Sequence, residues 1–235
     1  MQKTCLDCPH REEGFLKGVG EKACKEFSDG LARYSVAGRG KFIFHQGEPV
    51  TGVYLICRGV VKLTTVVPGG EEAIVDLAVP CSIISGVSDG AAASHPCAAV
   101  TTGGQVEIGR MGWRQLRLLG ERHPALALQL ARHFSENLFR LYRRVGMARL
   151  PVEQRVALLL EHLVNLLDRA GSEEEVVEIP LSNKELAQAV STAPETLSRS
   201  LRDLRAKGIL KVEKRTIRVR RKAMRQYLEK VNGEE

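Results

Sequence analysis

Hydrophobic and polar positions follow two different patterns along this chain. From Lys41 to about Ile108, short runs rich in Val, Ile, Leu and Phe are interrupted by glycines and by Pro68-Gly69-Gly70. Short runs with frequent turn signals are typical of an all-β sandwich or barrel, and Pro68-Gly69-Gly70 predicts a hairpin tip. The first 40 residues predict a short helical lead, because Glu21–Ala32 places its apolar residues on one face.

A helical period replaces the β pattern after Trp113. From Pro124, a residue that suits the first turn of a helix, apolar positions recur at spacings of three and four for about 25 residues. A helix this long with a narrow apolar stripe needs another helix against it. Its own copy in a homodimer is the simplest partner, and packing within the domain is the alternative. The predicted dimer-contact residues are Leu130, Phe134, Leu138, Leu141 and Val145.

Pro151 breaks this pattern and predicts a hinge near residues 149–152. A second amphipathic helix is expected at Val152–Leu167, and a short strand at Val176–Pro180. We therefore expect three regions, which are a β-rich domain with a short helical lead at residues 1–120, the long helix at 121–150 and a C-terminal domain at 151–235.

Two short helices separated by a tight break follow. Ser182–Val190 opens with a capping box, in which Ser182 is the N-cap and Glu185 stands three residues later. After residues 191–193, Pro194 opens a helix that runs to about Lys207. Together they predict a helix-turn-helix unit. Residues 209–212 and 216–219 alternate like a two-stranded wing.

Positive charge is concentrated in this last region. The 235-residue chain has a formal net charge of +7, whereas residues 195–230 contain thirteen Lys or Arg and four Asp or Glu, a net charge of +9. A concentrated positive face indicates a polyanionic partner, and a solvated basic tail is the alternative.

The second helix of such a unit enters the major groove with its first residues at the base edges. Glu195, Ser198 and Arg199 share one helical face there. Arg199 can donate two hydrogen bonds to guanine, and Glu195 can accept one from cytosine. The residues that we assign to phosphate contacts are Thr196, Arg202, Arg205, Lys211, Lys214 and Arg215.

Nearly the whole chain resembles the CRP/FNR superfamily of transcription regulators. The resemblance is carried by FHQGE at 44–48, VYLI at 53–56, RGVVKL at 58–63, the long helix and ETLSR at 195–199. It implies an α+β fold with a cyclic-nucleotide-binding-like β-roll (a double-stranded jelly roll), a long dimerisation helix and a C-terminal winged helix-turn-helix. Where the family usually turns on glycine, this chain has Ser191.

The resemblance also implies a function. A homodimer would bind double-stranded DNA at palindromic, TTGAT-like half-sites under the control of an effector or a redox signal. Glu195, Ser198 and Arg199 match the FNR-type reading residues. Contact with RNA polymerase follows by analogy, and activation is the family's commoner mode.

The effector is not identified by the sequence. The family's cyclic-nucleotide pocket uses a Gly-Glu and an Arg-Ser pair, which fall by resemblance at Cys81-Ser82 and Ala93-Ser94. Without that Glu and Arg, a buried phosphate would be unpaired, so we do not expect cyclic AMP. A changed pocket, which could instead ligate haem or respond to oxidants, is predicted at Cys81, Ser82, Ser94, His95 and Cys97.

Cysteines offer a second kind of sensor. Cys5 and Cys8 resemble the start of an FNR-type iron–sulfur motif, whose remaining ligands would fall at Gly14 and near Val106. Candidate metal ligands are Cys5, Cys8 and Cys24. A thiol redox pair or an unstructured tail are the alternatives for Cys5 and Cys8, and simple burial is the alternative for Cys24.

Enzymatic and membrane functions are not predicted. The chain lacks a Gly-x-Ser-x-Gly elbow, a phosphate-binding glycine loop and a His-Glu-x-x-His motif. Its apolar runs are far shorter than the ~20 residues of a membrane span, so we expect a cytoplasmic protein. The alternative function is a ligand- or metal-binding redox sensor that binds nucleic acid without sequence preference.

Overall fold

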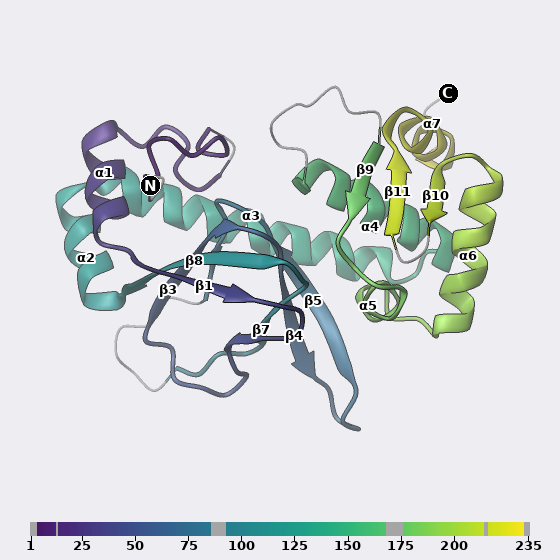
Figure 1. Cartoon of the computed structure of the whole chain (residues 1–235), viewed down its shortest axis with the longest axis horizontal. Helices are drawn as coiled ribbons and strands as arrows, with labels where there is room; N and C mark the ends of the chain where they lie inside the picture. Colours follow the sequence, from purple (N-terminus) through teal and green to yellow (C-terminus); the bar gives the residue numbers. More distant parts are fainter. Residues whose placement is uncertain (1–3, 13, 86–92, 168–175, 214–215, 233–235) are drawn as a thin grey trace. The chain divides into compact units, whose positions relative to one another are not determined.

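A computed structural model of the chain describes residues 4–12, 14–85, 93–167, 176–213 and 216–232 (Figure 1). The chain divides into two compact units. The N-terminal unit comprises Met1–Val66 and Val75–Tyr142, and the C-terminal unit comprises Val67–Ile74 and Arg143–Glu235.

Two four-stranded sheets form the β-roll of the N-terminal unit. One has the strand order β1-β8-β3-β6 and the other β2-β7-β4-β5. Neighbouring strands such as β1 and β8, or β4 and β7, pair antiparallel. The strands are β1 (Ala32–Ala37), β2 (Phe42–Phe44), β3 (Gly52–Arg58), β4 (Val61–Val66), β5 (Glu72–Ala78), β6 (Ile83–Ile84), β7 (Ala98–Thr101) and β8 (Gln105–Gly112).

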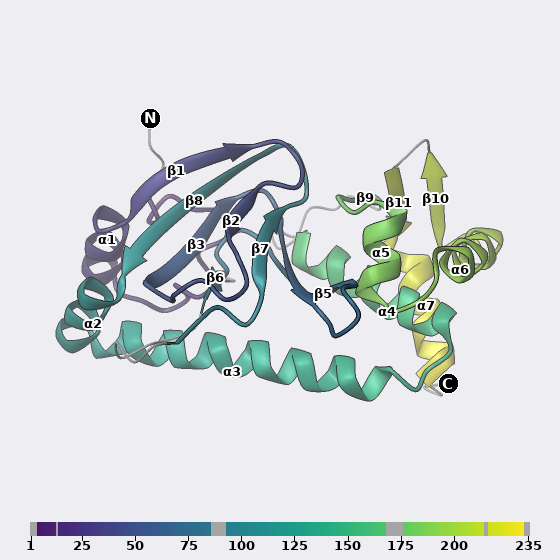
Figure 2. The same cartoon turned by 90° about the horizontal axis from the view of Figure 1, so that it is seen from below.

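Strand β3 is buried on both faces, which explains its unbroken apolar sequence. Side chains alternate across a strand, so Tyr54 and Ile56 join one core cluster with Ile108 of β8. Val53 and Leu55 point the other way, into a second cluster formed with the N-terminal segment and the helices. These helices are α1 (Glu21–Asp29), α2 (Trp113–Arg122) and α3 (Pro124–Met147). Figures 1 and 2 show α1 and α2 side by side, with α3 running along the strands.

The prediction of a helical lead over the first 40 residues is wrong for its last part, which forms a strand. Helix α1 ends at Asp29, and β1 begins at Ala32. Gly30 closes the helix, because its N–H bonds back to the carbonyl of Glu26. The hairpin tip predicted at Pro68-Gly69-Gly70 is confirmed, since the N–H of Val67 bonds to the carbonyl of Glu71, and Gly69 and Gly70 have positive φ.

The C-terminal unit has the winged helix-turn-helix fold. Its elements are α4 (Val152–Leu167), β9 (Val176–Ile179), α5 (Asn183–Ala189), α6 (Pro194–Ala206), β10 (Leu210–Glu213), β11 (Thr216–Arg220) and α7 (Arg221–Asn232). The strands form one antiparallel sheet in the order β10-β11-β9. Helix α7 was not expected, because most of its residues are charged or polar and only Met224 and Leu228 are deeply buried.

Local interactions set the geometry of the helix-turn-helix. The capping box is present, because the Oγ of Ser182 accepts from the N–H of Glu185 while Glu185 accepts from the N–H of Ser182. Ser191 adopts the left-handed conformation, with φ +51°, that its place in the turn requires. Leu186 and Ala187 of α5 are buried with Leu197 and Leu201 of α6. The predicted pair of short helices is therefore confirmed.

We predict that Ser182→Ala lowers the free energy of unfolding of the C-terminal unit by about 1 kcal/mol, because α5 loses its N-cap. Urea unfolding followed by circular dichroism measures this loss. Ser198→Ala is the matched control, since Ser198 is exposed on α6, and it should leave stability within about 0.5 kcal/mol of the wild type. Equal values for the two variants would contradict the assignment.

Candidate functional site

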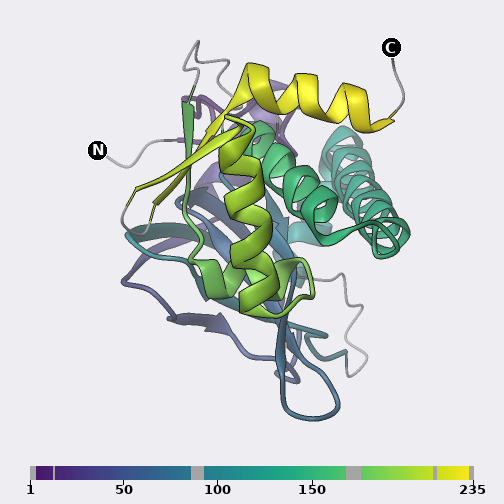
Figure 3. The same cartoon turned by 90° about the vertical axis from the view of Figure 1, so that its right-hand side faces the viewer.

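Helix α6 has one buried and one exposed face. Leu197, Leu201 and Leu204 are at most 4% exposed and hold the helix in the unit. Glu195, Ser198 and Arg199, the three predicted base-reading residues, are exposed on its first two turns. Figure 3 shows this unit with α6, in light green, running across the front. The arrangement leaves all three side chains free to meet a ligand.

Two arginines that the sequence interpretation missed fix the turn before α6. Arg155 of α4 donates to the carbonyl of Val190 at 2.7 Å, and Arg144 of α3 donates to the carbonyl of Ala189 at 2.7 Å. Arg144 also donates to the carbonyl of Ile74 at 3.1 Å. Cations at the C-terminal end of a helix satisfy its last carbonyls, so these contacts hold α5 in place.

The C-terminal end of α6 is held by a small polar cluster. Lys207 forms an ion pair with Glu153 of α4, and the hydroxyl of Tyr227 in α7 donates to the same carboxylate at 2.6 Å. Burial acts to raise the pKa of Glu153, but the hydrogen bonds from Lys207 and Tyr227 hold it below its usual value. Lys207 thus has a structural partner, and both ends of the α5–α6 unit are anchored.

The residues predicted for phosphate contacts lie on and beside α6. Arg202, Arg205 and Lys211 are exposed, and Thr196 is half-buried. Lys214 and Arg215 lie outside the described residues. A groove of about 470 Å³ is lined by Arg205, Gly208, Leu210, Lys211, Val212 and Arg220. Arg220, which the sequence interpretation did not select, therefore belongs with this basic surface.

Helix α3 carries two apolar faces, where the sequence interpretation saw one. Leu130 and Phe134, predicted at the dimer contact, are half-buried and pack against the N-terminal core beside the buried Leu126. The predicted Leu138, Leu141 and Val145 continue the same stripe toward the C-terminal end of the helix and are exposed, and Leu128, Phe139 and Tyr142 are exposed on the outer side. Spacings of three and four run along the whole stripe, so periodicity alone did not distinguish its buried half from its exposed half.

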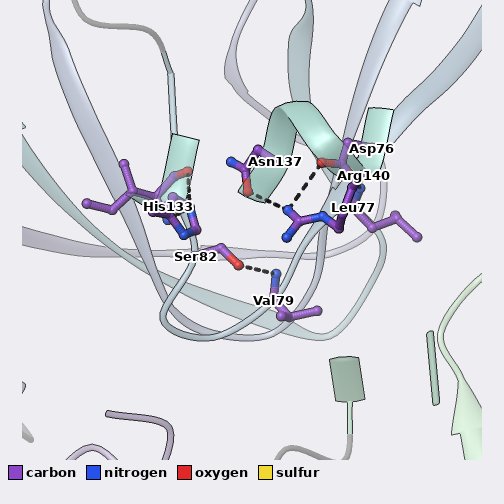
Figure 4. Close-up of polar contacts among 8 residues, drawn as sticks. Asp76, Leu77, Val79, Ser82, His133, Asn137 and Arg140 are labelled. Atoms are coloured by element: carbon purple, nitrogen blue, oxygen red, sulfur yellow. Dashed lines mark hydrogen bonds and ion pairs between the residues drawn. The ribbon is translucent and has the colours of Figure 1, made fainter. Parts of the chain in front are cut away.

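A polar cluster lies where α3 faces the β-roll (Figure 4). Arg140 donates to the Oδ1 of Asn137 at 2.6 Å and pairs with Asp76 of β5 at 3.6 Å. The Nε2 of His133, which is 7% exposed, lies 3.2 Å from the nitrogen and 3.1 Å from the oxygen of Ile83. The sequence interpretation missed this cluster, because Asp76 and Arg140 are far apart along the chain.

Known proteins match both units. The cyclic nucleotide-binding domain family matches residues 36–123, and the Crp-like helix-turn-helix domain family matches residues 154–227. The chain belongs to the CRP/FNR superfamily of transcription regulators. It is a regulator with a helix-turn-helix DNA-binding domain and not an enzyme, as the sequence predicted.

Individual relatives of this CRP/FNR regulator have low sequence identity to it but match most of its length. It is 22% identical over 182 residues to the transcriptional activator protein anr of Pseudomonas aeruginosa, covering 77% of this chain and 74% of that one. It is 27% identical over 208 residues to the CRP-like cAMP-activated global transcriptional regulator of Mycobacterium tuberculosis, covering 87% and 91%. The structure of FixK2 from Bradyrhizobium japonicum has a TM-score of 0.71 at 21% identity, covering 83% of this chain and 96% of that one.

The residues predicted to line the regulator's effector pocket have different surroundings. Ser94 is exposed, whereas Ser82 is buried and its Oγ accepts from the N–H of Val79 at 3.3 Å (Figure 4). His95 is 2% exposed and stacks on Phe44 with ring centroids 3.9 Å apart. Cys97 is half-buried, and burial and the nearby Asp76 raise its pKa. Cys81 is buried and faces Cys8.

The cysteines do not fit the family's iron–sulfur cluster. Among the residues that the structure describes, no group of three or more His, Cys, Asp or Glu is placed to hold a metal ion. Gly14 has no room for a side chain, since a Cβ there would lie 2.2 Å from the Cβ of Cys81, and Val106 is fully buried in the β-roll core. Cys24, a candidate metal ligand, is also fully buried, and burial raises its pKa to about 11.

No helix in the described part of the chain is both long enough and apolar enough to cross a membrane.

We predict that stability falls on acidification partly through His95. Burial lowers the pKa of this imidazole below 6.5, so the unfolded chain takes up a proton that the folded chain resists. The contribution is therefore complete above the unfolded pKa and is lost as the pH falls below it. Urea unfolding between about pH 7.5 and pH 5 should show a shallower pH dependence for His95→Phe than for the wild type.

His45 provides the control for this pH dependence, because its side chain is exposed. His45→Gln should keep the pH dependence of the wild type. A His95→Phe protein that loses stability as steeply as the wild type would contradict the role of His95.

Proposed function

We propose that this regulator binds palindromic DNA with TTGAT-like half-sites as a homodimer, and that an effector or redox signal other than cyclic AMP controls it. The observation that carries the proposal is the exposed set of Glu195, Ser198 and Arg199 on the leading turns of α6. These residue types, spaced along one helical face, can hydrogen-bond to the edges of base pairs. A surface that only binds phosphates would need cations but no particular order of polar residues.

Each reading residue offers a different kind of contact. The guanidinium of Arg199 can donate in parallel to the O6 and N7 of guanine, and the carboxylate of Glu195 can accept from the amino group of cytosine. Ser198 adds a short polar contact between them. These side chains are exposed on a helix whose end is held by the Lys207–Glu153 ion pair and whose preceding turn is held by Arg155, so a rigid surface would meet the base edges.

Affinity is supplied by a separate set of cations. Arg202, Arg205 and Lys211 are exposed, and Arg205 and Lys211 line the same groove as Arg220. Contacts from such residues to phosphates fix the register of the protein and depend on salt, without reading sequence. Thr196 can add a hydroxyl contact to a phosphate at the start of α6.

A second copy of the chain is the proposed partner of the outer face of α3. Leu128, Phe139, Tyr142 and Val145 are 59–75% exposed there. A continuous apolar face on a long helix is unfavourable in water, and the same face of another copy would cover it. Two recognition helices held in this way would read two half-sites about one helical turn, or ~34 Å, apart.

The altered pocket argues against cyclic AMP. Ser82 stands where the resemblance places a glutamate and Ala93 where it places an arginine, so no carboxylate or guanidinium at these positions can hold a ribose and a cyclic phosphate.

Activation, through contact with RNA polymerase, is the proposed mode of regulation. Anr of Pseudomonas aeruginosa and FnrA of Stutzerimonas stutzeri are both named transcriptional activators. The latter is 23% identical to this chain over 219 residues.

We predict that Arg199→Ala weakens binding to a TTGAT-type palindrome by about 1–3 kcal/mol and binding to random DNA much less, because the bidentate contact to guanine is lost. Fluorescence anisotropy with both DNAs at physiological salt measures the difference. Lys211→Ala is the matched control, since loss of a phosphate contact should weaken both complexes to the same extent.

Equal losses on both DNAs for Arg199→Ala would contradict base reading. They would favour the alternative of a sensor module that binds nucleic acid without sequence preference. The Lys211→Ala variant loses the same charge, so it shows how much of the loss in affinity comes from charge alone.

We predict that Leu138→Glu makes the protein monomeric, because it places a carboxylate at the proposed contact between α3 helices and costs at least about 2 kcal/mol of dimer stability. Sedimentation velocity measures the oligomeric state. Leu118→Glu on α2 is the control, because Leu118 and Leu138 are 45% and 46% exposed. A dimer that survives Leu138→Glu but not Leu118→Glu would place the interface elsewhere.

A further inference from the structure

Two cysteines far apart in the sequence meet in the N-terminal unit. The sulfur atoms of Cys8 and Cys81 are 3.5 Å apart, although 73 residues separate them along the chain. Cys81 is 2% exposed, and Cys8 is half-buried, so solvent reaches only one side of the pair freely. A disulfide requires the sulfurs to approach by about 1.5 Å more, which small side-chain rotations can supply.

The backbone around Cys81 is built closely around this contact. Gly14 leaves no space for a Cβ beside Cys81, and the N–H of Phe15 donates to the carbonyl of Cys81 at 3.3 Å. Cys81 itself has φ +63°, a conformation that a residue with a side chain adopts at a cost. Glycine would suit this backbone better, but it would not provide the thiol that faces Cys8.

The other thiols have different neighbours. Cys5 and Cys57 both accept hydrogen bonds from the guanidinium of Arg33, at 3.2 and 3.3 Å. Cys24 is fully buried in the core, and Cys97 lies near Asp76. The short sulfur–sulfur contact makes Cys8 and Cys81 a pair that a small movement can join.

We propose that Cys8 and Cys81 are a redox-active pair that hydrogen peroxide or another hydroperoxide converts to an intramolecular disulfide, which alters DNA binding. The disulfide stands on the geometry of the pair alone. Its effect on DNA rests on the proposed function, because it supplies the redox signal of the same regulator.

The chemistry proceeds in two balanced steps. The thiolate of Cys8 attacks one oxygen of hydrogen peroxide and breaks the O–O bond, which gives a sulfenic acid on Cys8 and one water molecule after protonation. The sulfur of Cys81 then attacks that of Cys8 and displaces hydroxide, which takes the proton of the Cys81 thiol and leaves as a second water. Two thiols are oxidised, and one peroxide is reduced to two water molecules.

Exposure decides the order of these steps. Cys81 is 2% exposed, so an oxidant in solution has little access to it. Cys8 is the more accessible of the two and meets the oxidant first. Cys81 then resolves the sulfenic acid.

A short path connects Cys81 to α3. Ser82 follows Cys81, and Ile83 is the next residue, whose backbone nitrogen and oxygen both lie within 3.2 Å of the Nε2 of His133 in α3. Movement of Cys81 on disulfide formation would therefore act two residues away from Ile83, which contacts α3 through His133. The outer face of α3 is the proposed dimer contact. In this way the disulfide biases the geometry of the dimer and its affinity for DNA.

Mass spectrometry of the whole protein tests the pair directly. Anaerobically reduced protein is treated with hydrogen peroxide, unreacted thiols are alkylated, and the digest is analysed without reduction. The expected result is a cross-linked peptide that joins Cys8 to Cys81, two hydrogen atoms lighter than its separate parts, and its loss on reduction. A disulfide between Cys5 and Cys8 or between Cys5 and Cys57, or only over-oxidised Cys8, would overturn the proposal.

Variants test the effect on DNA. We predict that peroxide changes the affinity of the wild type for its palindrome by about fivefold or more, and that Cys8→Ser and Cys81→Gly abolish the change. Cys81→Gly also suits the positive φ at this position, so the variant should fold. Cys57→Ser is the control, because Cys57 is half-buried like Cys8, and it should respond like the wild type.

The outcomes separate the two proposals. A Cys8–Cys81 disulfide that leaves DNA affinity unchanged would overturn its regulatory role. A reduced protein that binds the palindrome no better than random DNA would instead overturn the proposed function, whatever the state of the cysteines.

Discussion

The two opposed apolar faces of α3 are the constraint on which the rest of the architecture depends. The inner face, through Leu126, Leu130 and Phe134, packs against the core beneath the β-roll. The outer face, through residues such as Phe139 and Tyr142, is exposed in a single chain. In the proposed homodimer, this helix would couple the β-roll to the spacing of the two DNA-binding domains.

The DNA-reading surface is made by local forces that act on α5 and α6. The capping box fixes the start of α5, two arginines hold its last carbonyls, and the leucines of α6 pack against it. Residues 197, 201 and 204 pack α6 into the unit, and positions 195, 198 and 199 remain exposed. Packing and the proposed recognition thus use different sides of one short helix.

The features that the sequence predicted well are those encoded by neighbouring residues. The capping box at Ser182, the turn at Ser191 and the period of α6 need only a few adjacent positions. Helix α7 was not predicted, because its two buried residues lie among many charged ones. Strand β1 was not predicted, because the helical period of α1 was extended past Gly30. The meeting of Cys8 with Cys81, and of Arg140 with Asp76, depends on chain segments that only the folded structure brings together.

The central claim is that two identical α6 helices, related by contacts between α3 helices, read two copies of one short sequence. Selection of bound sites from a pool of randomised duplexes by the purified, reduced protein, followed by sequencing, tests this claim most directly. The account predicts enrichment of an inverted repeat whose half-sites are centred about one helical turn apart. Enrichment of a single unrepeated half-site, or no enrichment at all, would contradict it.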